Sequence, residues 1–216
     1  MPILAMGGGP NERLLDYVLG LGRGPRVLYV PTAAMEDAAA TVTWFERLRG
    51  RAEMTLLSFH PWPPADLGDV ALEHDVVIVP GGNTANMLAI WRVHGFDEVL
   101  REAWERGIVL AGWSAGAICW FEAGVTDSFG PELAAMDCLG FLTGSACPHY
   151  DGEELRRPRY AELLRDGLPP GIAIDDDVAV RFDGTDLTEV VTARAGATAY
   201  RVSADGEEAL EARLLA

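Results

Sequence analysis

The chain has 216 residues, of which 49% are hydrophobic and 23% charged, a composition typical of a globular protein with a sizeable core. Its formal charge of −16 repels phosphate backbones and anionic membranes, which argues against nucleic-acid or membrane partners. No apolar run could span a bilayer and no signal peptide is recognisable, so a cytoplasmic protein is expected. Three cysteines without paired spacing fit reduced thiols in that compartment.

Strand-like and helix-like segments alternate over the first half of the chain. The strands are expected at 3–6, 26–30, 54–59, 75–79 and 108–111. The helices are expected at 11–21, 38–48, 84–93 and 96–105, with Asn11 as the N-cap of the first. Because the strand segments are apolar throughout, they favour a parallel sheet covered on both faces. We therefore predict an α/β fold with a doubly wound, mostly parallel sheet.

Beyond residue 171 the pattern changes to short strand-like runs separated by Asp-Gly and Ala-Gly turns. They cover 172–174, 178–182, 187–192 and 198–202. Such runs predict a mostly antiparallel edge formed by the C-terminal part of the chain. No repeat, low-complexity segment or linker interrupts the sequence, so residues 1–216 are expected to form one domain.

Three glycine-rich turns, at 7–9, 81–82 and 112–116, follow predicted strands. Ligands of open parallel sheets bind at the C-terminal strand ends, so these turns are expected to line one crevice. Neither Gly-x-Gly-x-x-Gly nor a P-loop lysine is present, which argues against a nucleotide cofactor. No His-Glu-x-x-His or Cys-x-x-Cys occurs, and the acidic run 175–177 lacks the other ligands of a calcium loop, so no metal is expected.

The third turn, Gly112-Trp-Ser-Ala-Gly116, has the Gly-x-Ser-x-Gly form of a nucleophile elbow. Bare glycines let the chain reverse sharply, which would raise Ser114 at the sheet edge beside the first amides of a helix. The same glycines would also suit a turn that only packs a helix on a strand. A serine nucleophile needs a base, and His149, at the end of a small-residue strand, is the best placed of the four histidines.

Three motifs occur in a characteristic order: Pro80-Gly-Gly-Asn-Thr84, Gly112-Trp-Ser-Ala-Gly-Ala117 and Pro148-His-Tyr150. Over about residues 3–182 the sequence resembles peptidase E, the aspartyl dipeptidase family of serine peptidases related to cyanophycinase. The resemblance implies a fold related to class I glutamine amidotransferases, with Ser114 as nucleophile and His149 as base. It also implies an oxyanion hole from the amides of Gly82 and Ala115, and a substrate contact at Asn83.

For the acid that orients the base, the resemblance offers two positions. Peptidase E has its acid shortly after the serine, where this chain has Asp127. Cyanophycinase-like relatives have a glutamate well after the histidine, where this chain has Asp176. We take Asp127 as the first choice and Asp176 as the second, although either would also suit a solvated turn.

Peptidase E cleaves dipeptides that begin with aspartate, and binding that carboxylate calls for a cation, preferably arginine. Three arginines crowd together shortly after His149, and the substrate-binding arginine of the family corresponds to Arg156 or Arg159. The same cluster would equally suit a solvated helix start paired with Glu153 and Glu154.

The sequence thus predicts a serine peptidase that hydrolyses short peptides as a dipeptidase or other exopeptidase, with aspartate preferred. Two other classes stay open: an α/β-hydrolase-type esterase, whose order of serine, acid and histidine Asp127 would allow, and a non-catalytic, amidotransferase-like binding domain. A short peptide is the expected partner, no cofactor is expected, and a homodimer is left open.

Overall fold

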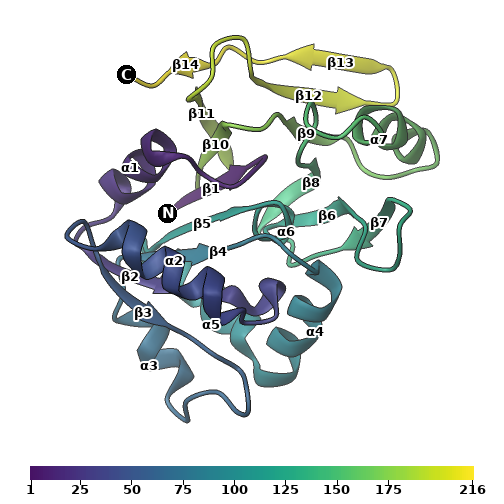
Figure 1. Ribbon diagram of the computed structural model, residues 1–216. Helices are drawn as coiled ribbons and strands as arrows, with labels where there is room; N and C mark the ends of the chain where they lie inside the picture. The colour runs from purple at the N-terminus through teal and green to yellow at the C-terminus, as the bar shows by residue number, and fades with distance from the viewer.

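The computed structural model describes residues 1–216 and contains two β-sheets (Figure 1). Sheet A has eight strands in the order β14-β11-β10-β1-β5-β4-β2-β3. Its strands are β1 (Pro2–Met6), β2 (Arg26–Tyr29), β3 (Glu53–Leu56), β4 (Val76–Val79), β5 (Val109–Trp113), β10 (Val178–Asp183), β11 (Asp186–Thr192) and β14 (Arg213–Leu214). The five strands from β1 to β3 in this order are parallel, and β10 and β11 add an antiparallel edge. The predicted doubly wound α/β sheet is confirmed.

Helices cover both faces of sheet A, which explains why its central strands β1, β4 and β5 carry no charged residue. In β1, Leu4 and Met6 are buried in one cluster with the side chains of α1 (Glu12–Leu21) and α2 (Ala38–Leu48). Ile3 and Ala5 are buried in the other cluster with the side chains of α3 (Leu67–Leu72), α4 (Thr84–His94) and α5 (Phe96–Glu105). Successive side chains of a strand point to opposite faces, so a strand buried on both sides must be continuously apolar.

Side-chain caps fix where three of these helices begin. The side-chain oxygens of Asn11, Asp37 and Asn83 accept the backbone N–H three residues ahead, at the starts of α1, α2 and α4. Each cap satisfies one of the amides that a helix leaves without an internal partner. The left-handed Gly95, with φ 67°, separates α4 from α5. The predicted cap at Asn11 is therefore confirmed, and the observed helix limits agree closely with the predicted ones.

Sheet B was not predicted from the sequence. Its six strands have the order β13-β12-β9-β8-β6-β7. They are β6 (Phe121–Thr126), β7 (Ala134–Asp137), β8 (Leu142–Cys147), β9 (Gly171–Ile174), β12 (Ala199–Ser203) and β13 (Gly206–Ala209). The predicted C-terminal antiparallel edge is present as β10 and β11 of sheet A, but two of the four predicted runs, β9 and β12, join sheet B together with β13. Figure 1 shows α7 (Arg156–Arg165) beside the β12–β13 hairpin at the top of the view.

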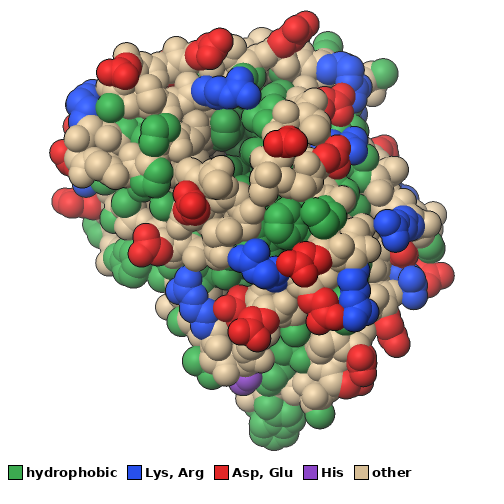
Figure 2. Space-filling view, turned by 180° about the vertical axis from the view of Figure 1, so that it is seen from behind, with side chains coloured by type: hydrophobic (Ala, Val, Ile, Leu, Met, Phe, Trp, Pro, Cys, Tyr) green, Lys and Arg blue, Asp and Glu red, His purple; other side chains and the backbone are tan.

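On the face drawn in Figure 2, Asp and Glu are interspersed with arginines and do not form one broad patch. None of the helices combines the length and apolar character needed to traverse a lipid bilayer.

Candidate active site

Ser114 lies in the turn between β5 and the short helix α6 (Ala115–Ile118), with φ 53° and ψ −114°. A positive φ is uncommon for a residue other than glycine and indicates local strain. The positions that flank Ser114 at 112 and 116 must be glycine, because backbone carbonyl oxygens lie too close for a Cβ atom. A Cβ on Gly112 would lie 2.3 Å from the carbonyl oxygen of Gly116, and a Cβ on Gly116 would lie 2.0 Å from that of Val79. The turn is therefore held in place by direct contact between β4, β5 and α6.

The glycine-rich turns lie close together at the C-terminal edge of sheet A, as their positions after strands predicted. A Cβ on Gly81 would lie 3.0 Å from the Cβ of Ser114, and a Cβ on Gly9 would lie 3.5 Å from Nε1 of Trp113. The Ser114 N–H also donates a 3.2 Å hydrogen bond to the carbonyl of Met6, the last residue of β1. Ser114 is thus bordered by the turns that follow β1 and β4.

The backbone amide of Gly82 has no hydrogen-bond acceptor within the protein. The turn that contains Gly82 packs against the 3-10 helix η1 (Pro31–Ala34), where the Asn83 N–H donates to the carbonyl of Ala33 at 2.9 Å. Gly82 has a φ of 140°, and a Cβ on it would lie 2.1 Å from the same carbonyl oxygen. Ala115 is the first residue of α6, so its amide has no acceptor within the helix. Two amides on turns that border Ser114 therefore lack the usual backbone acceptors.

His149 follows β8 and is also a non-glycine residue with positive φ, 53°. Its Nδ1 lies 2.8 Å from Oδ1 of Asp176, in the turn at 175–177 that joins β9 to β10. A Cβ on Gly8 would lie only 2.5 Å from the same Asp176 oxygen, so the turn after β1, which borders the Ser114 turn, also contacts the carboxylate that pairs with His149. No hydrogen bond joins Ser114 to His149, a contact that often tightens only when substrate binds.

Asp127, our first choice for the acid, is not the partner of His149. Its side chain is exposed, and the neighbouring Ser128 docks onto the start of α4, where its Oγ accepts hydrogen bonds from the amides of Thr84 at 2.9 Å and Ala85 at 3.3 Å. The loop after β6 therefore turns toward α4. Asp176, the second choice, is the carboxylate that contacts the imidazole.

Asn83 is occupied by local structure. Its Oδ1 accepts the N–H of Asn86 at the start of α4, and its Nδ2 donates to the carbonyl of Ser128 at 3.0 Å. Both ends of the amide thus have protein partners, which does not favour the predicted substrate contact.

The two arginines predicted to bind substrate also have internal partners. Arg156 is only 4% exposed and donates to Glu153 at 2.7 Å and to the carbonyl of Val125 at 3.1 Å. Arg159 donates to the carbonyl of Leu133 at 3.0 Å and to Glu162 at 2.9 Å. These bonds fasten α7 to the β6–β7 region of sheet B and leave Arg156 little freedom to bind a ligand.

Two polar side chains next to Asp176 were missed by sequence reasoning. Asp151 accepts the Asp176 N–H at 2.8 Å, and Arg194 donates to the Asp176 carbonyl at 3.0 Å and to the Asp151 carboxylate. Partial burial alone would raise the pKa of Asp151, but the hydrogen bonds from Arg194 and from the Asp176 amide hold that pKa below its usual value. No sequence motif marks Arg194, because it lies in a separate turn after β11.

The cysteines do not offer an alternative nucleophile. Cys119, Cys138 and Cys147 are all unpaired and buried. Burial raises the pKa of Cys147, the closest in sequence to His149, to about 12, so its thiol stays protonated at neutral pH. No group of three or more His, Cys, Asp and Glu side chains is arranged to hold a metal ion.

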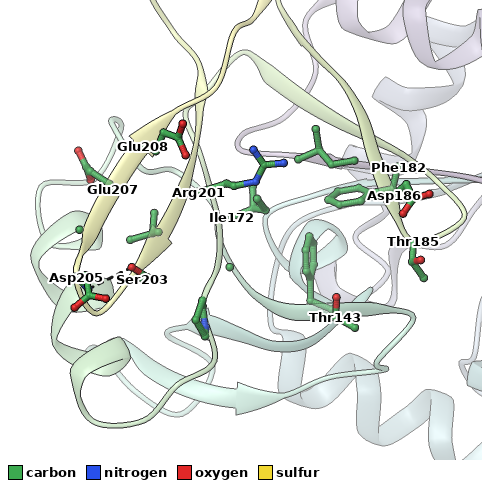
Figure 3. A pocket seen from close by; sticks show the side chains of 16 residues that line it. Thr143, Ile172, Phe182, Thr185, Asp186, Arg201, Ser203, Asp205, Glu207 and Glu208 are labelled. Atoms are coloured by element: carbon green, nitrogen blue, oxygen red, sulfur yellow. Dashed lines mark hydrogen bonds between the residues drawn. The ribbon is translucent and has the colours of Figure 1, made fainter.

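A hollow of about 1000 Å³ lies at the opposite end of sheet B, where β8 and β9 begin. Figure 3 shows Arg201 reaching from β12 across this hollow toward Phe182, with Thr143 below them. His149 and Asp176 instead follow the ends of β8 and β9. The hollow is therefore separate from the Ser114 turn, and no histidine lines it.

Comparisons with known proteins agree with this architecture. A sequence model of peptidase family S51 matches residues 3–190. The uncharacterized peptidase YgaJ of Bacillus subtilis (strain 168) is 45% identical over 210 residues, which are 93% of this chain and 91% of that protein.

Two crystal structures share the fold at low sequence identity. A peptidase from an acI-B1 Actinobacterium superposes with a TM-score of 0.70 at 20% identity, over 98% of this chain and 94% of its own. A candidate peptidase E protein from Listeria monocytogenes EGD-e superposes with a TM-score of 0.65 at 16% identity, over 94% of this chain and 98% of its own.

Proposed function

We propose that this protein hydrolyses short peptides through Ser114, His149 and Asp176. The chain belongs to peptidase family S51 and is a serine-type peptidase. The observation that carries this proposal is the 2.8 Å contact between Nδ1 of His149 and Oδ1 of Asp176, whose carboxylate touches the glycine turn that also borders the Ser114 turn. The positive φ values of Ser114 and His149 support it, because backbone strain of this kind gathers at functional sites.

The proposed reaction follows from which atoms of these residues have no hydrogen-bond partner in the protein. With its Nδ1–H donated to Asp176, the imidazole of His149 presents an unprotonated Nε2 that can accept the proton of the Ser114 hydroxyl. The Ser114 oxygen attacks the peptide carbonyl carbon, and the amides of Gly82 and Ala115 stabilise the negative oxygen that forms. His149 then returns the proton to the leaving amine, and water hydrolyses the acyl-enzyme by the same steps. Ser114 acts here as the serine of a nucleophile elbow.

The order of these residues along the chain argues against an esterase of the α/β-hydrolase type. Such enzymes place the acid between the serine and the histidine, which would require Asp127. Asp127 is exposed and does not contact His149, whereas Asp176 lies after the histidine. The order serine, histidine, acid instead fits the cyanophycinase-like arrangement.

The preference for an N-terminal aspartate stays a prediction. It requires a cation at the substrate side chain, and both Arg156 and Arg159 donate to protein oxygens. The proposal therefore commits to short peptides, cleaved in dipeptidase or exopeptidase mode, and the selected side chain is tested separately below.

The test of the proposed function is Ser114→Ala. The variant should lose hydrolysis of a dipeptide library by a factor on the order of 10⁴ or more, and should no longer react with a fluorophosphonate probe, while its circular dichroism is unchanged. Ser203→Ala, in the separate hollow, is the matched control and should behave like the unmodified protein. Turnover by Ser114→Ala near the unmodified rate would refute the proposal.

A further inference from the structure

The acid turn at 175–177 is where the chain leaves sheet B and enters sheet A. It joins β9 to β10, contains three consecutive aspartates and no glycine, and holds Asp177 at a φ of 63°. Four negative side chains gather here, because Asp151 lies beside the three residues of the turn. Such a turn is neither conformationally relaxed nor electrostatically favourable by itself.

Two side chains from outside the turn occupy both polar groups of the Asp176 backbone. Asp151, two residues after His149, accepts its N–H at 2.8 Å, and Arg194 donates to its carbonyl at 3.0 Å. Arg194 also donates to the Asp151 carboxylate and, through Nε, to Oδ2 of Asp177 at 3.3 Å. One guanidinium thus connects the histidine loop to the acid turn and offsets part of the negative charge gathered there.

Two glycines restrict the Asp176 carboxylate itself. A Cβ on Gly8 would lie 2.5 Å from its Oδ1, and a Cβ on Gly152 would lie 2.1 Å from its Oδ2. Both distances are too short for a real contact, so the carboxylate fits only because these positions are bare. Neither glycine needs a positive φ, so an alanine there would push on the carboxylate without straining its own backbone.

We propose that Arg194, Asp151 and Gly152 are positioning residues, which hold the carboxylate of Asp176 against Nδ1 of His149. The inference rests on the proposed function for its kinetic consequences, but the geometry it describes does not depend on any substrate. The three residues act through Asp176, and none of them is assigned a contact with the peptide.

The kinetic test uses Arg194→Ala and Gly152→Ala. Each should lower kcat by about 10- to 100-fold with little change in KM, because a misplacement of about 1 Å in a catalytic group costs rates of this size. Arg213→Ala, which removes another half-exposed ion pair, and Gly20→Ala, whose Cβ would meet nothing within 4 Å, are the matched controls and should keep normal rates. In an Asp176→Asn background, neither positioning variant should reduce the residual rate further.

A spectroscopic readout separates this inference from the proposed function. The proton on Nδ1 of His149 should give a low-field proton NMR signal in the unmodified protein, which weakens or disappears in Arg194→Ala, Gly152→Ala and Asp176→Asn but persists in Arg213→Ala and Gly20→Ala. Loss of the signal in Arg194→Ala and Gly152→Ala supports the positioning role even if no peptide is hydrolysed, in which case only the proposed function fails. An intact signal with normal kcat in both variants, or rate losses that multiply with Asp176→Asn, would overturn the inference. Should Arg194→Ala not fold, Gly152→Ala and Asp151→Asn give the same readout.

Discussion

The turn at Ser114 and the turn at 175–177 are built in different ways, although both belong to one candidate site. Around Ser114 the decisive contacts are between backbones: Gly112 and Gly116 touch carbonyl oxygens of α6 and β4 directly. At 175–177 the decisive contacts are made by side chains from distant segments, chiefly Arg194 and Asp151, with Asn11 donating to Asp177 at 2.9 Å.

Because of this difference, substitutions in the two turns should have different effects on folding and on activity. A contact between backbones cannot relax without moving a strand, so substitutions of Gly112 or Gly116 in the Ser114 turn should affect folding and activity together. Contacts made by partly exposed side chains contribute little to the free energy of unfolding, so changes at the acid turn should lower activity far more than stability. Substitutions at Asp176, Gly116 and Asp151 test the two sides of this comparison, and a substitution at Arg156 tests the choice of substrate.

The largest expected effect concerns the acid itself. Asp176→Asn presents the wrong hydrogen-bonding group to His149 and should lower kcat by a factor on the order of 10⁴, whereas Asp127→Asn should change it little. Dipeptide hydrolysis by the two variants, measured side by side with their thermal unfolding, decides between the acids. A loss confined to Asp127→Asn would restore the peptidase E arrangement and remove the acid turn from the site.

Gly116→Ala should be the most damaging change to folding. Its Cβ would lie 2.0 Å from the carbonyl oxygen of Val79, and a strand backbone cannot move aside as a side chain can. We expect a loss of about 3 kcal/mol or more in the free energy of unfolding, at the upper end for overpacked sites. Urea unfolding of Gly116→Ala and Gly152→Ala measures the contrast. Equal stability of the two variants would mean that the two turns are not built differently.

Arg156→Ala should reduce stability and leave substrate choice unchanged. Removing the guanidinium leaves the buried carbonyl of Val125 without its partner, at a cost of about 1–3 kcal/mol. The ratio of kcat/KM for Asp-Leu over Ala-Leu should stay within about twofold of the unmodified enzyme, for Arg156→Ala and Arg159→Ala alike. A selective loss of Asp-Leu turnover in either variant would restore that arginine as the substrate contact.

The smallest effect is a pH dependence at the acid turn. Because the folded protein lowers the pKa of Asp151, this carboxylate stabilises the folded state above its unfolded pKa of about 3.9, and the contribution is lost as the pH falls through the folded value. Asp151→Asn should therefore be less stable than the unmodified protein at pH 7, by less than about 1 kcal/mol, and the difference should shrink toward pH 3. Unfolding measured in urea at both pH values, with Asp127→Asn as a control, checks this. A difference that grows toward low pH would contradict the assigned ion pair.

The parts of the molecule that the sequence predicted are those in which local pattern decides structure. The helices at 38–48 and 96–105 begin and end where predicted, because apolar spacing, a cap or a glycine at their ends is written in contiguous residues. The strained turn at Ser114 could be predicted for the same reason, since its glycines are neighbours in the chain.

Sheet B and the carboxylate partner of His149 were harder to predict, because they depend on which distant segments pair. The run at 172–174 has the pattern of any short strand, and nothing within it indicates that β9 pairs in parallel with β8 while β10 joins the other sheet. Asp127 and Asp176 are both carboxylates in polar turns, so composition could not rank them. The internal partners of the arginine cluster could not be predicted for a related reason, since burial of Arg156 is decided by how α7 packs on sheet B.

Because β5 of sheet A presents Ser114 and β8 of sheet B presents His149, the enzyme has an alignment that no single strand ladder enforces. A slight tilt of one sheet against the other would separate Ser114 from His149 while every strand stayed paired. Warming should therefore abolish peptidase activity reversibly at a temperature below that at which the circular dichroism changes. Activity would then report the orientation of sheet A relative to sheet B.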